Sequence, residues 1–162
     1  MSHHVNPGPN ATYASTTTQV IADPTLGQVV TFNTIEVERG IALQTSGGVG
    51  SKIYVKQPGD YMVTFSAICN TTTGSNKNMS MWFRKNGTDI DRSNTTLRIT
   101  SNNPQVMAVT FIYTLAANDY LEMAMAGETT NCEIYAAPAV VAPSTPVQPA
   151  VPSIVLAIVQ VS

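Results

Sequence analysis

The segment SIVLAIVQVS, residues 153–162, has the composition of a strand that is covered on both faces. Seven of the eight residues from Ile154 to Val161 are apolar, and only Gln160 is not. Side chains alternate between the two faces of a sheet, so a strand with one solvated face alternates apolar and polar residues. Because that alternation is missing, we expect this strand to lie centrally in a sheet and to be dry on both sides.

Two further segments alternate incompletely. From Tyr61 to Ile68 and from Val106 to Leu115, one face carries the larger apolar residues, which suit the core of a sandwich. The other face carries smaller residues that are too apolar for an ordinary solvated surface. Another copy of the chain is the simplest cover for such a face, and a central position for the last strand also removes an aggregation-prone edge.

The rest of the chain reads as one all-β domain. Its 162 residues are enough for a single core, and only 11% of them are charged, against a usual level of about 25%. Helical periodicity is almost absent, whereas β-branched and turn residues recur about every 8 to 12 positions, as in sandwiches and barrels. We predict strands at 13–21, 28–36, 41–45, 51–56, 60–69, 78–85, 95–100, 105–116, 119–126, 131–136 and 153–161.

Turn residues separate these strands. Pro58-Gly59 suits a type II turn, and Asn86-Gly87 suits the type I′ turn of a tight hairpin because both residues tolerate positive φ. Asn118-Asp119 predicts another tight reversal. Five of the ten prolines fall in 138–152, which we expect to be an extended surface loop without regular pairing.

Charge and hydropathy argue against several classes of partner. The net charge is −2 and the eight basic residues are scattered, so no stripe could neutralise a run of phosphates, and we expect no nucleic-acid partner. No stretch approaches the roughly 20 apolar residues of a membrane span, and the first residues lack the pattern of an export signal. Cys69 and Cys132 are expected to be buried free thiols; a disulfide would require an oxidising compartment.

Four motifs occur in order along the chain: PGDYMVTFS, WFRKNGTDI, VTFIYTLAANDYLEM and the apolar strand at 153–161. Together they resemble the trimeric jelly roll of complement C1q-like and tumour necrosis factor-like domains, over about residues 28–162. The resemblance implies a two-sheet antiparallel jelly-roll sandwich and a homotrimer. Asn118-Asp119 stands where that family has Gly-Asp, and the usual aromatic-rich ending is aliphatic here. This ending, with the low charge, is more similar to the versions found in structural proteins of tailed bacteriophages.

Catalysis has little support in the sequence. The only histidines, His3 and His4, lie in a polar segment near the start, so no rigid Ser-His-Asp or Cys-His arrangement can be built from them. These two histidines either have no role or bind a metal ion weakly. We therefore predict a protein that is not an enzyme and uses no cofactor.

Two other positions admit a ligand-binding interpretation. Asp89 and Asp91 have the alternate spacing of a calcium loop, but its glycine and closing glutamate are missing, so we expect them to pair with Arg92 or Arg98. Trp82 lies in MSMWFRKN, whose alternation favours packing of one face into the core. An exposed aromatic for a glycan or protein partner is the alternative.

The chain divides into a polar arm, 1–12, and a jelly-roll domain, 13–162. Glycine and proline prevent the arm from forming its own core, so it is either a disordered terminus or an extended anchor laid over a larger surface. The candidate anchoring residues are Val5, Asn6, Pro7, Pro9 and Asn10.

These observations lead to three hypotheses. The first is a decoration or cement protein, made in the host cytoplasm, that stabilises a bacteriophage head as a homotrimer bound to the major capsid protein at the virion surface. The second is a receptor-binding or fibre-tip module that contacts a host glycan or protein through loops 70–78 and 138–152. The third is a C1q-like secreted binding protein. The candidate trimer contacts are Met62, Thr64, Ile68, Ala108, Ile112, Val155 and Val159. For the last strand, the sequence leaves open which of its two apolar faces meets the trimer axis.

Overall fold

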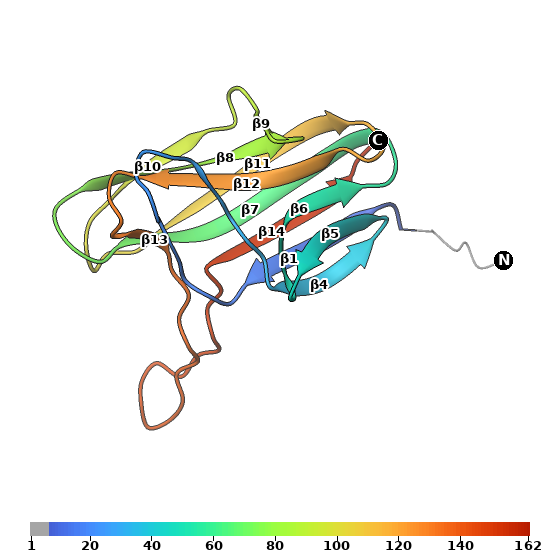
Figure 1. The fold of residues 1–162 in the computed structure, drawn as a ribbon. Coiled ribbons are helices and arrows are strands. Elements are labelled where there is room, and N and C mark those ends of the chain that lie inside the picture. Colours follow the sequence, from blue (N-terminus) through green and yellow to red (C-terminus); the bar gives the residue numbers. More distant parts are fainter. Residues whose placement is uncertain (1–6) are drawn as a thin grey trace.

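The structure, a computed structural model, describes residues 7–162 as two antiparallel β-sheets packed face to face (Figure 1). In the first, sheet A, β7 pairs with β11 on one side and with β14 and β13 on the other; β14 then pairs with β1, β1 with β4, and β13 with β2. Its strands are β1 (Asn10–Ser15), β2 (Gln19–Val20), β4 (Thr34–Arg39), β7 (Gly59–Thr71), β11 (Gln105–Leu115), β13 (Cys132–Ile134) and β14 (Ile154–Gln160).

The second sheet, sheet B, runs in the order β10–β8–β12–β6–β5, with β9 paired to β8 and β3 to β12. Its strands are β3 (Gln28–Val29), β5 (Ile41–Ser46), β6 (Val49–Val55), β8 (Lys77–Lys85), β9 (Thr88–Asp89), β10 (Thr95–Ile99) and β12 (Tyr120–Gly127). Residues 7–162 form no helix, so none of them belongs to a helix able to cross a membrane.

The central position predicted for the last strand is confirmed. β14 lies between β7 and β1, with Leu156 opposite both Phe65 and Tyr13. Ile154, Leu156 and Ile158 point into the sandwich and are fully buried. Burying an aliphatic side chain of this size stabilises a fold by about 1.5–3 kcal/mol. The three inward side chains of β14 therefore anchor sheet A to the core.

An aromatic cluster fills the core between β7, β8 and β11. The ring of Phe83 lies edge-on to Phe65 and Phe111, with ring centroids 5.7 Å apart in each pair, and to Tyr113 at 5.6 Å. Phe111 and Tyr113 stack on each other on β11 and are only partly buried. The aromatic core therefore reaches the edge of the sandwich at β11.

Two predicted strands are interrupted in the structure. The segment 13–21 divides into β1 and β2, because the chain leaves β14 after Ser15 and pairs next with β13. The segment 28–36 divides into β3, on sheet B, and β4, on sheet A. Between them the backbone N–H groups of Val30 and Phe32 donate to Met123 and Gly50, both on sheet B, and the two side chains fill the core.

Two of the three turns predicted from the sequence are confirmed. Asn86 and Gly87 have φ of 51° and 81°, which confirms the type I′ turn between β8 and β9. Asn118, with φ of 68°, forms the predicted reversal, which connects β11 on sheet A to β12 on sheet B. The type II turn is wrong: Gly59 has φ of 156° instead of about 80°. A Cβ there would collide with the Ser162 carbonyl oxygen and the Gln160 side chain, which explains the glycine.

The remaining boundaries need two corrections. β1 begins at Asn10, so residues 10–12 belong to the sandwich and not to the arm. The loop 138–152 stands clear of both sheets (Figure 1), but it is not unpaired. Backbone bridges join Ala137 to Val151 and Val140 to Gln148, which makes its base a short two-stranded ribbon. Cys69 and Cys132 are buried free thiols, as expected.

Candidate interaction surface on sheet A

The face of sheet A that points away from the core carries aligned rows of small and apolar side chains. Each row crosses β11, β7 and β14 because the strands pair in register. The rows are Ile112, Met62 and Val159; Thr110, Thr64 and Ala157; and Ala108, Ser66 and Val155, with Val106 beside Ile68 at the end. We call these eleven residues face A.

Four large apolar side chains of face A are exposed. Ile112 is 63% exposed, Val106 60%, Val159 37% and Met62 36%. Asp60, where β7 begins, is the only charged residue in β7, β11 and β14. Contiguous apolar surface of this kind marks an interaction site on a soluble protein.

Polar groups on and beside face A are largely matched within the chain. The hydroxyls of Thr64 and Thr110, directly opposite each other, hydrogen-bond at 2.9 Å. Asp60 accepts hydrogen bonds from the hydroxyls of Thr114 and Ser162, which lower the pKa of its carboxyl. Because the central threonines satisfy each other, covering them removes fewer hydrogen bonds to water than covering lone hydroxyls would. The charge of Asp60 stays at the rim.

All seven candidate trimer contacts lie on face A. The burial of Ile154, Leu156 and Ile158 also shows which side of β14 faces outward: it is the side of Val155 and Val159. The other four residues of face A, Ser66, Val106, Thr110 and Ala157, were missing from the predicted set. The same alternation that identified the others places them on this face, so the signal was present in the sequence.

The structure describes only three of the five candidate anchoring residues. Val5 and Asn6, with the two histidines, lie outside the described residues, and Pro7 is exposed. Pro9 and Asn10 are attached to the sandwich: the Gln160 N–H donates to the Pro9 carbonyl at 2.9 Å, and Asn10 pairs with Val159. Pairing of β1 with β14 therefore removes Pro9 and Asn10 from any free arm.

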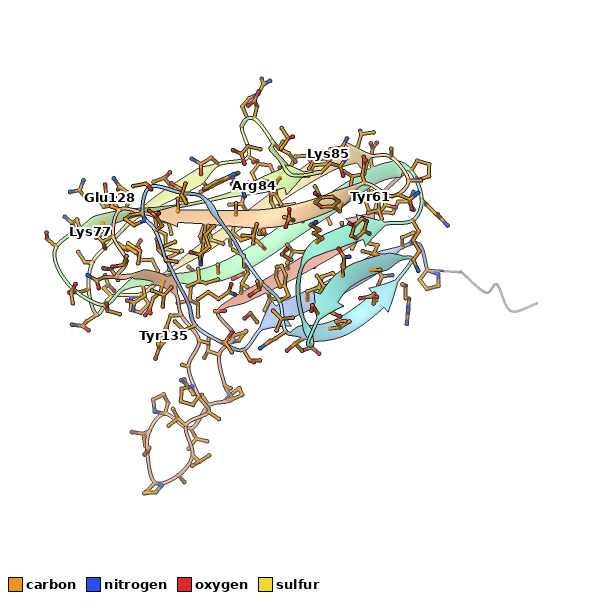
Figure 2. All side chains as sticks on the ribbon, viewed as in Figure 1. Tyr61, Lys77, Arg84, Lys85, Glu128 and Tyr135 are labelled. Atoms are coloured by element: carbon orange, nitrogen blue, oxygen red, sulfur yellow. The ribbon has the colours of Figure 1, made fainter. Side chains whose placement is uncertain are left out.

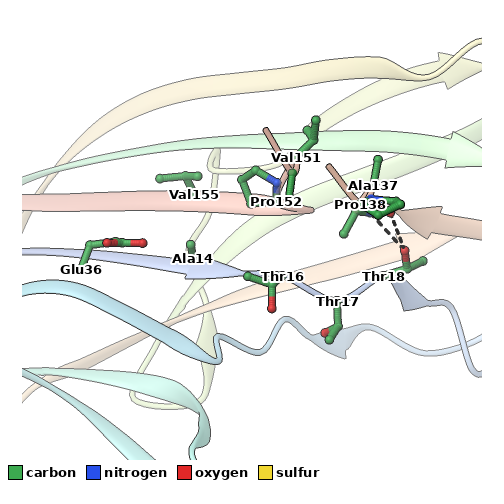
Figure 3. A pocket seen from close by; sticks show the side chains of 12 residues that line it. Ala14, Thr16, Thr17, Thr18, Glu36, Ala137, Pro138, Val151, Pro152 and Val155 are labelled. Carbon is green, nitrogen blue, oxygen red and sulfur yellow. Dashed lines mark hydrogen bonds between the residues drawn. The ribbon is translucent and has the colours of Figure 1, made fainter. Parts of the chain in front are cut away.

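A hollow of about 690 Å³ adjoins face A where the loop 138–152 leaves the sandwich (Figure 3). Thr18 fixes one wall, because its hydroxyl donates to the Ala136 carbonyl and accepts from the Ala136 N–H. The lining residues are Ala14, Thr16, Thr17, Thr18, Glu36, Ala136, Ala137, Pro138, Ala150, Val151, Pro152 and Val155. Glu36 is the one charged side chain among them, and Val155 is shared with face A.

The outward face of sheet B contains the residues for which calcium or glycan binding was considered. Asp89 accepts from Trp82 Nε1 and Arg84 Nε, each at 2.7 Å, so its predicted pairing with Arg92 or Arg98 is wrong. These bonds lower the pKa of Asp89. Trp82 points away from the core, while Met79, Met81 and Phe83 pack inward. Among residues 7–162, no three His, Cys, Asp or Glu side chains gather closely enough to hold a metal ion.

Comparisons with known proteins identify the fold. No protein-family model matches the chain, and no curated protein matches it in sequence. Among solved structures, it is similar to murine APRIL at pH 8.5, with a TM-score of 0.57 and 11% identity over 94% of this chain and 98% of that one. The globular domain of zebrafish complement 1qA gives a TM-score of 0.57 and 14% identity over 96% and 98%. The sandwich is thus a C1q/TNF-like jelly roll.

Proposed function

We propose that the protein is a structural protein of a bacteriophage virion that works as a homotrimer and decorates the capsid. The observation that carries the proposal is face A: three adjacent strands present exposed apolar side chains with a single charge at the rim. A neighbouring copy would cover this face at little polar cost, and the C1q/TNF-like fold supports that arrangement. The proposed trimer contacts are the seven candidates together with Ser66, Val106, Thr110 and Ala157.

The edge of the sandwich offers a matching surface for face A. β11 is the outer strand of sheet A, and Phe111 and Tyr113 reach this edge from the core side while remaining partly exposed. Contact between the edge of one copy and face A of the next joins two different surfaces, and such contacts close into a ring when each copy is rotated by 120°. Ile112 and Val106, on β11 itself, would then lie beside both neighbours.

The decoration role follows from what a trimer presents at its two ends. Pro9 and Gln160 lie beside each other, so the three N-terminal segments emerge at one end of the strands. The loop 138–152 precedes Ile154 and therefore leaves from the opposite end. Three weak contacts with the major capsid protein, made together, give a tight attachment. The aliphatic, charge-poor ending supports placement in a virion, with synthesis in the host cytoplasm.

Two measurements test the proposal. The first is the mass in solution by light scattering, which should be that of three 17.3 kDa chains, about 52 kDa. The second is binding of the purified protein to intact heads of the virus that encodes it, compared with binding to host cells. A single-chain mass would overturn the trimer. A trimer that does not bind intact heads would overturn only the decoration role.

The hollow beside the loop 138–152 favours a second candidate function. It lies at the end of the sandwich opposite the termini, where a receptor-binding or fibre-tip module would meet a host glycan or protein. Binding to host cells and not to heads would support this candidate. Binding to neither would favour a C1q-like secreted binding protein, for which the likeness to the zebrafish complement domain is a likeness of fold.

A further inference from the structure

The tip of the loop 138–152 is an apolar segment without a partner in its own chain. Val141 and Val147 are 69% and 66% exposed, more than any other large apolar side chain among the described residues. No charged residue follows Glu133 in the sequence, so neither the loop nor the strand that follows it carries a charged side chain. Exposed apolar side chains on an uncharged projection are costly in water and favour a protein contact.

The loop presents its tip in an ordered way. The Val140 N–H donates to the Gln148 carbonyl at 2.9 Å and the Gln148 N–H returns to Val140 at 3.0 Å, just below the tip. A second pair of hydrogen bonds joins Ala137 and Val151 at the base. Because the ribbon holds residues 141–147 at a fixed place, less conformational entropy is lost when they bind.

The hollow has the chemistry to receive this tip. Alanine, valine, proline and threonine side chains line it, and Glu36 is its only charge. Its wall is formed by the base of the loop, at Ala136–Pro138 and Ala150–Pro152, and none of residues 141–147 contributes to it. The tip of a chain therefore leaves its own hollow open.

We infer that the tip, residues 141–147, of one copy occupies the hollow of the next copy, an inference that rests on the proposed homotrimer. Val155 belongs to both face A and the hollow, so a neighbour that covers face A also borders the hollow. The occupant is then a second copy of this chain, which brings an uncharged apolar segment to an apolar lining. The same contact occurs three times around the ring and holds each subunit to the next; we call this contact of tip and hollow the clasp.

Disulfide trapping tests the contact directly in the full chain. Thr17 lines the hollow and is exposed, and the native thiols Cys69 and Cys132 are fully buried. Oxidation of the double variant T17C/V147C should give covalent three-chain species on a non-reducing gel, whereas either single variant can link at most two chains. V147C with T96C, on sheet B, is the matched control. A link within one chain, or no more cross-linking than in the control, would overturn the inference.

A second variant separates this inference from the proposed function. V141S/V147S should keep the three-chain mass but exchange subunits with tagged trimers at least about 10-fold faster than the wild type, because two apolar side chains no longer fill the hollow. L26S, at a side chain that is 62% exposed, should exchange at the wild-type rate. Unchanged exchange in a wild-type-like trimer would overturn the clasp and leave the trimer standing. A single-chain mass for the wild type would overturn both.

Discussion

The two outward faces of this sandwich share one core and differ in how they meet water. Sheet B is covered by polar pairs: Arg84 bonds Asp89 at 2.7 Å, Ser51 donates to Glu122 at 2.8 Å, and Lys52 lies 5.0 Å from the centre of the Tyr120 ring. Figure 2 shows Arg84 and Lys85 on β8 of this sheet. Face A has the Thr64–Thr110 pair and otherwise exposes mainly apolar groups.

The difference shows which face is suited to burial. Covering sheet B would remove several charges from water, and the desolvation of ions costs more than an imperfect partner returns. Covering face A removes mainly apolar surface, which is favourable by roughly 25 cal/mol per Å². The same strand period of two produces both faces, so the choice of outward residues, and not the fold, makes sheet A the face better suited to burial.

The largest effect is expected from a charge placed at the centre of face A. I112D should convert the proposed trimer into single chains of 17.3 kDa by light scattering, because a buried, unpaired carboxylate costs several kcal/mol in each interface. T96D, which places the same charge on the outward face of sheet B, should keep the three-chain mass. Equal behaviour of the two variants would remove the distinction between the faces.

The second prediction compares neighbouring residues of β14 in the monomeric I112D background. L156A should lower the free energy of unfolding by about 2–5 kcal/mol, since it opens a cavity beside Phe65. V155A should lower it by less than about 1 kcal/mol, because Val155 then faces solvent. Urea denaturation measures both changes. A loss of similar size at the two positions would mean that the outward face is packed even in the single chain.

The third prediction concerns the buried thiol of Cys69, on β7. Burial raises the pKa of Cys69 from 9.0 to about 12, so the folded chain keeps a proton that the unfolded chain has already lost. Stability is therefore unaffected by this group below about pH 9 and falls as the pH rises from 9 towards 12, by up to about 1.4 kcal/mol per pH unit. C69A should flatten the curve of unfolding free energy against pH in that window. The same slope in C69A would assign the alkaline loss to other groups.

The sequence predicted correctly those elements that are determined by a few consecutive residues. The missing alternation at 154–161 predicted a central strand, and Asn86-Gly87 predicted its hairpin, because each depends on a few consecutive residues. The alternation also placed the candidate contacts on β7 and β11 on one face, which the structure shows to be the outward one. Whether Val155 or Leu156 faced outward was undecided, since an apolar strand carries no such information until its neighbours are known.

Long-range geometry determined what the sequence could not predict. The segment 28–36 reads as one strand, but its halves pair with different sheets, a choice that depends on Met123 and Gly50 far along the chain. Asp89 pairs with Arg84 because the Asn86-Gly87 hairpin folds one strand back onto the other. The hollow is assembled from residues 14–18, Glu36 and the two sides of the loop 138–152, which no local pattern connects.

The smallest effect is expected on sheet B, where polar groups already satisfy one another. D89N should lower the free energy of unfolding by only about 0.2–1 kcal/mol, because the ion pair with Arg84 is exposed on the Asp89 side. It should also change the fluorescence of Trp82, the only tryptophan, whose indole N–H loses a charged acceptor. D91N, at an exposed carboxylate two residues away, should change neither quantity.

The pH dependence gives the sign of this last effect. Hydrogen bonds from Arg84 and Trp82 lower the pKa of Asp89, so its contribution is present above the ordinary value of 3.8 and is lost as the pH falls through the lowered one. The difference between wild type and D89N should therefore close in acid, while the three-chain mass stays the same at neutral pH. Dissociation of D89N at neutral pH would show that sheet B also takes part in assembly and would contradict the proposal that its outward face stays uncovered.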